Sequence, residues 1–433
     1  MDILLFDQHS DGHHIEYAGK LLDQLEDDPR VSTVDFLLTQ PHPEGNLSTG
    51  SRPEYMRQFN HNVYYLSDSF NFTNKRKIVK YLFEFAGSRD YDILHALHID
   101  DLLFELATTP VPDRTFKMCG TINGAFFFMG DNRVLSWADE VATELSIHVN
   151  GKNIRRLMSA LADYNKSLTS KLCPPGISLR GCLASDMIDN VFVHSDKAHS
   201  YINKVGNQST SCTVVPDPLE LWTEESNKKN LRNELGIPTE GPMFLFFGQT
   251  RYEKGPDILL DACSRYEGPP CTVVLAGPPV DVDDEDVALT TTASNIALHS
   301  TLEFVPEEDV KSYFHAADAV VLPYRRQFGE YRTSGVFQKA CAAVRPLIVS
   351  DFGELALRTN RYDLGMVFPP EDPDALADIL SIAASESVHG FEKDQMVAYA
   401  RSQSYDNLAE ETVDTYSSLY DLKTSSEISR SSH

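Results

Sequence analysis

The sequence predicts an α/β protein built from two doubly wound domains. Its 433 residues, 42% of them hydrophobic, suffice for two domains with separate cores. Short apolar runs recur along the chain, each followed by a segment of helical length, as in parallel sheets with crossover helices. The segment TVVPDPLE interrupts this rhythm where an apolar strand stops, because Pro216 and Pro218 fix two backbone φ angles. We expect the interdomain hinge there.

The first domain is predicted to span residues 1–216. Its expected strands lie near residues 3, 36, 93, 116 and 191, in the runs ILLF, DFLL, DILHAL, FKMCG and VFVHS. The first helix is expected after Gly12, because apolar residues recur at helical spacing from Ile15 to Leu25. A further helical pattern covers residues 135–172.

The second domain is predicted to span residues 217–400. Its strands are expected near residues 244, 274, 320 and 348, in the runs MFLFFG, TVVLAG, AVVLPY and PLIVS. A helix over residues 401–423 is expected to pack back on the first domain. The polar residues 424–433 are expected to form a disordered tail.

The charge balance excludes nucleic acid as a partner, because 64 acidic residues face 38 basic ones. The 17 lysines beside 21 arginines fit either a halophilic protein of a salt-rich cytoplasm or an ordinary acidic protein. The sequence shows neither a secretion signal nor a membrane-spanning run, which predicts a cytoplasmic protein. The seven cysteines form no CxxC pair, which favours buried, reduced thiols.

The segment FFGQTRYEKGPDILLDA carries the strongest local signal. An apolar strand ends at Gly248 and a helix begins near Pro256, a favoured first helical position. A turn of this kind at the carboxyl end of a parallel sheet brings cations and helix N–H groups together, as a diphosphate requires. We predict that Arg251 and Lys254 bind a diphosphate, with Gln249 and Thr250 beside them. The alternative is a pair of surface charges on an ordinary loop.

A second turn lies in LPYRRQFGEYRTSGVFQKACAAVRPLIVS. Thr333 and Ser334 precede a helix with an apolar stripe, so Ser334 is expected to be its N-cap. Gly335 and Val336 begin the helix, where a glycine lets an anion approach the N–H groups. The alternative is an ordinary capped helix. Since both turns follow strands of one sheet, we expect them to line one crevice.

These motifs resemble the family-four glycosyltransferases. The basic loop G-x-x-R-x-x-K-G runs from residue 248 to 255, and the LLDA helix, the AGP strand end and the PY…TSG…P segment follow it. The resemblance covers most of residues 243–370 and, more loosely, GHHIEYA and VFVHSD in the N-terminal half. It implies a GT-B fold, in which two Rossmann-like domains face each other across a cleft. The N-terminal domain would then be the acceptor side and the C-terminal domain would bind the nucleotide sugar.

The resemblance also implies the reaction. The chain would be a hexosyltransferase-like enzyme that moves a sugar from a UDP- or GDP-sugar to a glycan or lipid-linked acceptor, with retention of configuration and without a required metal or cofactor. A peripheral contact with the inner face of a membrane and the oligomeric state stay open. Two alternatives remain, a catalytically silent sugar-nucleotide-binding or scaffold protein and a nucleotide-sugar epimerase.

One departure from the family pattern favours the silent alternative. Counting back from Pro346 puts Tyr331 and Lys339 at the places of the family's usual pair of glutamates. We expect the neighbouring Glu330 to take over a contact with the sugar or the ribose.

Several residues of the first domain are candidates for the acceptor side. His95 and His98 lie around the end of a predicted strand, where side chains can face the cleft between the domains. Of the two, His98 is the preferred candidate for a catalytic contact. Asn123 stands where relatives commonly carry a histidine, and Gly12, His13 and His14 are expected to contact the acceptor or the donor phosphate. A structural hydrogen-bonding role is the alternative for each histidine. The acidic run DVDDED lacks a metal-ligand spacing, so no metal is predicted.

Overall fold

The computed structural model describes residues 1–9, 13–38, 62–66, 75–110, 113–123, 179–206, 210–222, 227–290, 292–385 and 392–431. The described residues form two compact units. Unit 1 holds those up to Pro216 and those from Tyr405 onward, and unit 2 runs from Asp217 to Ser404. The predicted helical pattern over residues 135–172 and Gly12 lie outside the described residues.

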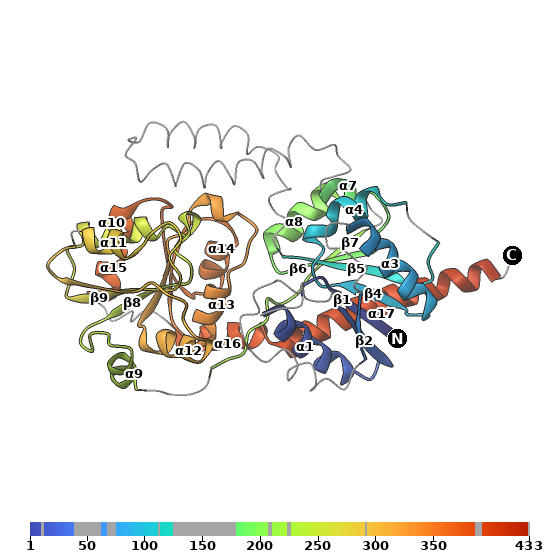
Figure 1. The fold of residues 1–433 in the computed structure, drawn as a ribbon, viewed down its shortest axis with the longest axis horizontal. Coiled ribbons are helices and arrows are strands. Elements are labelled where there is room, and N and C mark those ends of the chain that lie inside the picture. Colours follow the sequence, from blue (N-terminus) through green and yellow to red (C-terminus); the bar gives the residue numbers. More distant parts are fainter. Residues whose placement is uncertain are drawn as a thin grey trace. The chain divides into compact units, whose positions relative to one another are not determined.

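Unit 1 contains a parallel sheet, for which the described residues give the strand order β3-β2-β1-β4-β5-β6-β7 (Figure 1). The strand order reverses between β1 and β4, and such a switch point is where open α/β sheets bind ligands, at the carboxyl ends of the strands. The strands are β1 Asp2–Asp7, β2 Thr33–Leu38, β3 Val63–Tyr65, β4 Ile93–Ala96, β5 Lys117–Ile122, β6 Asn190–Val193 and β7 Ser211–Val214. The helices between them are α1 His13–Glu26, α3 Lys75–Ser88, η1 Asp100–Leu102, α4 Leu103–Thr108, α7 Leu179–Leu183 and α8 Asp196–Val205.

The last helix of the chain, α17 (Tyr405–Ser431), completes unit 1. Its buried side chains share a core with α1 and one face of the sheet, and Tyr416 is fully buried there. The predicted disordered tail is replaced by helix as far as Ser431, because no proline or glycine interrupts the chain after Lys423.

Unit 2 contains a second parallel sheet, ordered β10-β9-β8-β11-β12-β13 in the described residues. The strands are β8 Met243–Phe247, β9 Cys271–Ala276, β10 Ile296–Thr301, β11 Ala319–Leu322, β12 Leu347–Ser350 and β13 Gly365–Phe368. The helical elements are α9 Lys228–Glu234, η4 Tyr252–Lys254, α10 Pro256–Arg265, α11 Asp284–Leu289, α12 Glu307–Ala316, η5 Arg326–Phe328, α13 Gly335–Ala342, α14 Gly353–Arg361, α15 Pro373–Ser385 and α16 Lys393–Ser402. The order reverses between β8 and β11.

Both faces of the second sheet are covered by helices, as expected for a parallel sheet. Alternate side chains of β8, such as Leu245 and Phe246, enter two different apolar cores. One core includes residues of α9, α12, α13, α14 and α16, and the other includes residues of α10 and α15. The predicted α/β class with two doubly wound sheets is therefore confirmed.

Candidate functional site

Two turns meet at the switch point of unit 2. The first turn follows β8 and runs from Gly248 to Gly255, and the second follows β11 and leads to α13. Gly255 has a φ of 65°, and a Cβ there would lie 2.1 Å from the Pro323 carbonyl oxygen. Only glycine fits this close approach, which joins the first turn to the second.

The Lys254 ammonium group and the start of α13 both lie close to Gly248. A Cβ at Gly248 would lie 3.1 Å from Lys254 Nζ and 3.8 Å from Val336 Cγ2. The structure therefore brings the predicted basic turn and the predicted helix N-terminus together at one point. The functions of these residues stay predictions.

In the protein without a ligand, the positive charge of Lys254 is energetically unfavourable. Its burial, and after it the positive charges of Arg251 and Arg332, lower the pKa of Lys254 to about 8 against the opposing effect of Glu253. Like charges gathered in a partly desolvated place are characteristic of sites that bind anions. Arg332, which the sequence analysis did not single out, thus belongs to the same electrostatic cluster.

A buried ion pair fixes the two turns to each other. Arg325, which follows β11, donates two hydrogen bonds to the Asp257 carboxylate at the start of α10, at 2.8 and 2.7 Å. Its Nη1 also donates to the Tyr252 carbonyl oxygen at 2.7 Å, and its guanidinium lies 3.8 Å from the centre of the Tyr252 ring. This bidentate geometry holds η4, and with it Lys254, at the end of the sheet.

Replacing Arg325 by alanine is expected to destabilise the protein by about 3 kcal/mol, because the Asp257 carboxylate then loses its partner in a largely buried place. Urea unfolding measures the change. The adjacent Arg326 is exposed and serves as the matched control, so Arg326→Ala should stay within about 0.5 kcal/mol of the wild type. Equal unfolding midpoints for both variants would contradict a stabilising role of the Arg325–Asp257 ion pair.

Other residues of the first turn take structural contacts. Thr250 is fully buried, and its hydroxyl donates to the Val282 carbonyl oxygen at 2.7 Å and accepts from the Val280 N–H at 2.8 Å. We therefore assign Thr250 to positioning the turn. The Gln249 side chain accepts a hydrogen bond from Arg251 Nε at 2.7 Å, which orients the exposed guanidinium.

The start of α13 lies at the predicted N-cap. Ser334 occupies the N-cap position, although among the described residues its side chain accepts no hydrogen bond from the helix backbone. Its hydroxyl lies 3.3 Å from that of buried Tyr324 instead. A Cβ at Gly335 would meet no heavy atom of the described residues within 4 Å, so there is open space beside this glycine. Thr333 and Val336 are half-buried.

The residues around the missing glutamate pair lie in different surroundings. Glu330 is half-buried, and its carbonyl oxygen accepts from the Glu354 N–H at 2.9 Å, at the start of α14. Lys339 forms a 3.5 Å ion pair with Glu307 at the surface. Lys339 is thus engaged elsewhere, and Glu330 keeps its predicted role only as a proposal.

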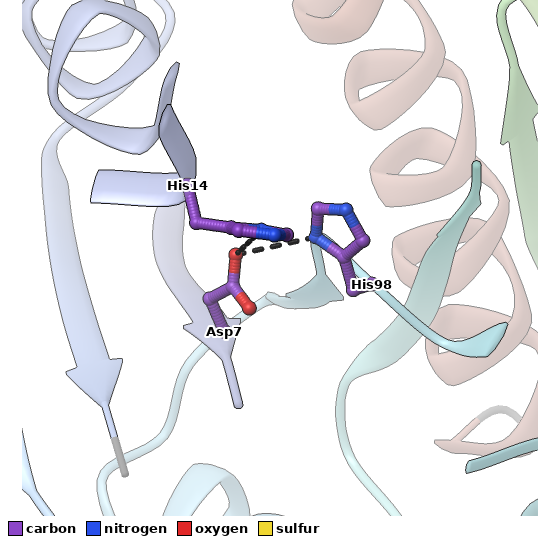
Figure 2. A group of neighbouring side chains, drawn as sticks. All are labelled: Asp7, His14 and His98. Carbon is purple, nitrogen blue, oxygen red and sulfur yellow. Dashed lines mark hydrogen bonds and ion pairs between the residues drawn. The ribbon is translucent and has the colours of Figure 1, made fainter. Parts of the chain in front are cut away.

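In unit 1, candidate residues gather at the other switch point (Figure 2). Asp7 ends β1, His14 lies in the first turn of α1, and His98 follows β4. The Asp7 Oδ2 atom lies 3.5 Å from His14 Nδ1 and 3.2 Å from His98 Nδ1. His13 begins α1, but its side chain lies outside the described residues.

Asp7 was not predicted, although it is the centre of this cluster. Its burial by itself raises the pKa, but hydrogen bonds from His14 and His98, the charge of His98 and the His9 N–H together hold the pKa of Asp7 well below its usual value. An aspartate that ends the first strand, two residues before a histidine, is the signal that could have identified it.

Two further polar candidates, His95 and Asn123, form hydrogen bonds within unit 1. His95 is buried in the core, hydrogen-bonded to Tyr416 of α17 and, at 2.8 Å, to Thr121 of β5. Asn123 donates from its side chain to the Leu97 carbonyl oxygen at 3.2 Å and from its backbone to Asp100 Oδ2 at 3.0 Å. These contacts hold the segments that follow β4 and β5.

A large part of unit 2 matches a known protein family. Residues 227–403 match the family described as Glycosyl transferases group 1. The matched residues contain the two turns, Lys254, Arg332 and the start of α13, so the resemblance to glycosyltransferases seen in the sequence is confirmed.

Curated proteins similar to this chain are named as glycosyltransferases. The D-inositol 3-phosphate glycosyltransferase of Corynebacterium urealyticum is 28% identical over 54% of this chain and 58% of its own length. The O-antigen chain mannosyltransferase C of Escherichia coli is 26% identical over 66% of this chain and 73% of its own length. The chain therefore spans little more than half of the first of these relatives.

Solved structures show the fold of both units. Anabaena HepE in complex with UDP and glucose has a TM-score of 0.62 at 15% identity, covering 96% of this chain and 100% of that one. Sucrose-phosphate synthase from Thermosynechococcus elongatus has a TM-score of 0.61 at 16% identity, covering 98% and 100%. The predicted GT-B class is confirmed. None of the helices in the described ranges combines the length and the apolar character that a bilayer crossing requires.

Proposed function

We propose that the chain is a retaining hexosyltransferase that moves a sugar from a nucleoside-diphosphate sugar to a glycan or lipid-linked acceptor. The observation that carries the proposal is the partly desolvated Lys254 at Gly248, with Arg251 and Arg332 acting on it, beside the N-terminus of α13. Cations and helix N–H groups together suit a diphosphate. UDP-sugars are the first donors to test, since Anabaena HepE was solved with UDP and with UDP-glucose.

In the proposed reaction, the bond between the anomeric carbon and the diphosphate oxygen breaks, and the leaving diphosphate takes the electron pair. Lys254, Arg251 and the α13 N–H groups stabilise the charge that develops there, in place of a divalent cation on the diphosphate. The acceptor hydroxyl attacks the same face of the sugar and gives up its proton. We further propose that His98, His14, Asn123 and Glu330 contact the sugar or the acceptor.

A donor panel tests this function. UDP- and GDP-sugars are first ranked by thermal shift, since a ligand at 100 times its dissociation constant stabilises by about 2.7 kcal/mol. The best donor is then assayed for transfer to inositol phosphate and mannosylated glycan acceptors, which the relatives' names suggest. Binding without transfer or hydrolysis would establish the silent alternative, which the departure from the family's glutamate pair at Tyr331 and Lys339 favours. Sugar isomerisation without an acceptor would establish an epimerase.

Donor binding is expected to weaken above about pH 8. Lys254 has a pKa of about 8 in the free protein, so its cation is present below that pH and is lost above it. A bound diphosphate favours the cation, so the dissociation constant for UDP should rise up to about tenfold per pH unit above pH 8. Calorimetric titration with UDP at a series of pH values measures this. The control is Lys254→Arg, whose cation does not titrate in this range, and an equal slope in both proteins would argue against Lys254.

The site of action is proposed to be the cytoplasm. A lipid-linked acceptor would require a peripheral contact with the inner face of a membrane, which co-sedimentation with vesicles would detect.

A further inference from the structure

A group of potential metal ligands lies in unit 1. Asp7, His14 and His98 each offer one ligand atom, and these atoms all lie within 4.8 Å of one another (Figure 2). We propose that these side chains bind a divalent transition-metal ion of the Zn²⁺ type. The sequence predicted no metal, since the acidic run DVDDED lacks a ligand spacing and the histidines gave only a weak indication, whereas this set is assembled from three separate segments.

The distances between the ligand atoms fit a metal of this kind. Zn²⁺ lies about 2.0–2.2 Å from imidazole nitrogen and carboxylate oxygen, so tetrahedral ligand atoms stand roughly 3.4 Å apart. Asp7 Oδ2 lies 3.5 Å from His14 Nδ1 and 3.2 Å from His98 Nδ1. The carboxylate and each imidazole are thus already at the separation that a shared ion requires.

The carboxylate is held in the orientation that a ligand needs. Asp7 is fully buried, and its Oδ1 atom accepts a hydrogen bond of 2.8 Å from the His9 N–H. That bond leaves Oδ2 facing the two imidazoles. A hydrogen bond of this type, made by the part of the ligand that does not bind the ion, fixes ligand orientation in metal sites.

Imidazole rings are crowded around this carboxylate. The ring centres of His14 and His98 lie 4.3 Å apart, and the ring of His9 lies 4.6 Å from that of His14. A metal ion binds neutral imidazole rings. Both rings stand beside the same carboxylate oxygen, as ligands of one ion would.

The ligand types select the class of ion. Two imidazoles and one carboxylate suit Zn²⁺ and neighbouring transition metals, whereas Ca²⁺ and Mg²⁺ prefer oxygen ligands. Three protein ligands leave one position open on a four-coordinate ion. Since one carboxylate only half-neutralises a divalent ion, that position favours water or an anionic oxygen of a ligand. The site also stands at the switch point between β1 and β4, where α/β sheets bind ligands.

Metal titration of the full-length protein tests the proposal. The protein is first dialysed against a chelator, then titrated with Zn²⁺ by calorimetry, and the bound metal is measured by elemental analysis. Co²⁺ serves as a spectroscopic probe, because its visible absorption reports the coordination geometry. We expect one Zn²⁺ per chain and a four-coordinate Co²⁺ spectrum.

The variants His98→Gln and His14→Gln each remove one proposed ligand. They should weaken Zn²⁺ binding by more than the roughly 10–100-fold loss that residues outside the ligand set cause. The matched control is His199→Gln, which removes a half-buried histidine of α8 in the same unit and should bind Zn²⁺ like the wild type. Far-ultraviolet circular dichroism checks that each variant is folded.

Two results would overturn the proposal: a wild-type protein that binds no stoichiometric Zn²⁺, or His98→Gln and His14→Gln proteins that bind it as tightly as the wild type. UDP binding, measured in parallel with and without chelator, tests the proposed donor site of unit 2 separately from Zn²⁺ binding. A failure of this site is therefore distinguishable from a failure of the proposed donor site.

Discussion

Replacing Lys254 by methionine is expected to lower kcat/KM about 10²–10³-fold while making the protein more stable. The loss of activity follows from removing a cation from the developing charge on the diphosphate. The gain in stability follows because burial and neighbouring arginines lower the pKa of Lys254 from 10.5 to about 8, so the folded protein holds this charge at a cost. Removing it should stabilise by up to about 3 kcal/mol.

The pH dependence of unfolding provides an independent test of the same variant. Between pH 8 and pH 10.5 the unfolded chain holds the Lys254 proton more tightly than the folded chain, so wild-type stability should rise with pH across this window. The methionine variant should lack that rise. Lys229→Met, at an exposed lysine of the same unit, is the control for both measurements. A methionine variant that is inactive and less stable would point to a structural role for Lys254.

Replacing Arg251 by alanine is expected to lower the transfer rate about 10²–10³-fold with little change in melting temperature. The guanidinium is about half exposed, with 48% of the side chain accessible, so its removal leaves no cavity. Gln249 and Glu253 orient it beside Lys254, where it can reach a bound diphosphate. The effect should appear in kcat/KM for the donor.

A closely matched control exists for Arg251. Arg265 lies in the same unit, is 47% exposed and also pairs with an acidic residue, Asp374. Arg265→Ala removes the same charge and the same surface, so it should leave turnover and stability near wild-type values. Similar turnover in the two variants would mean that Arg251 acts only through the general charge of the domain.

Most strands that the sequence predicted are buried on both faces. The apolar runs of β1, β8 and β11 are continuous because helices cover both sides of the sheets. The edge strand β7 is an exception, since the TVVPDPLE segment marks its end. Three other edge strands, β3, β10 and β13, were not predicted. β10 and β13 are mostly half-exposed, β10 ends in polar residues, and β13 and β3 are only four and three residues long.

The candidate site was predictable where glycines and local spacing encode it. Gly255 was the signal in the sequence for the basic turn. Its backbone conformation and its approach to Pro323 both depend on the absence of a side chain. Arg332, Arg325 and Asp7 were missed for a different reason. Each gains its importance from a partner on another strand or turn, such as Asp257 for Arg325, and such contacts appear only after folding.

Helix α17 imposes an order on the biogenesis of this protein. The ribosome makes residues 1–216 first, but the apolar surface that Leu408, Val413 and Tyr416 cover stays open until the final segment emerges. The intervening residues 217–404 can meanwhile assemble their own sheet. A nascent or prematurely terminated chain therefore exposes this apolar surface during translation. Such a chain is a target for chaperones and is prone to aggregation.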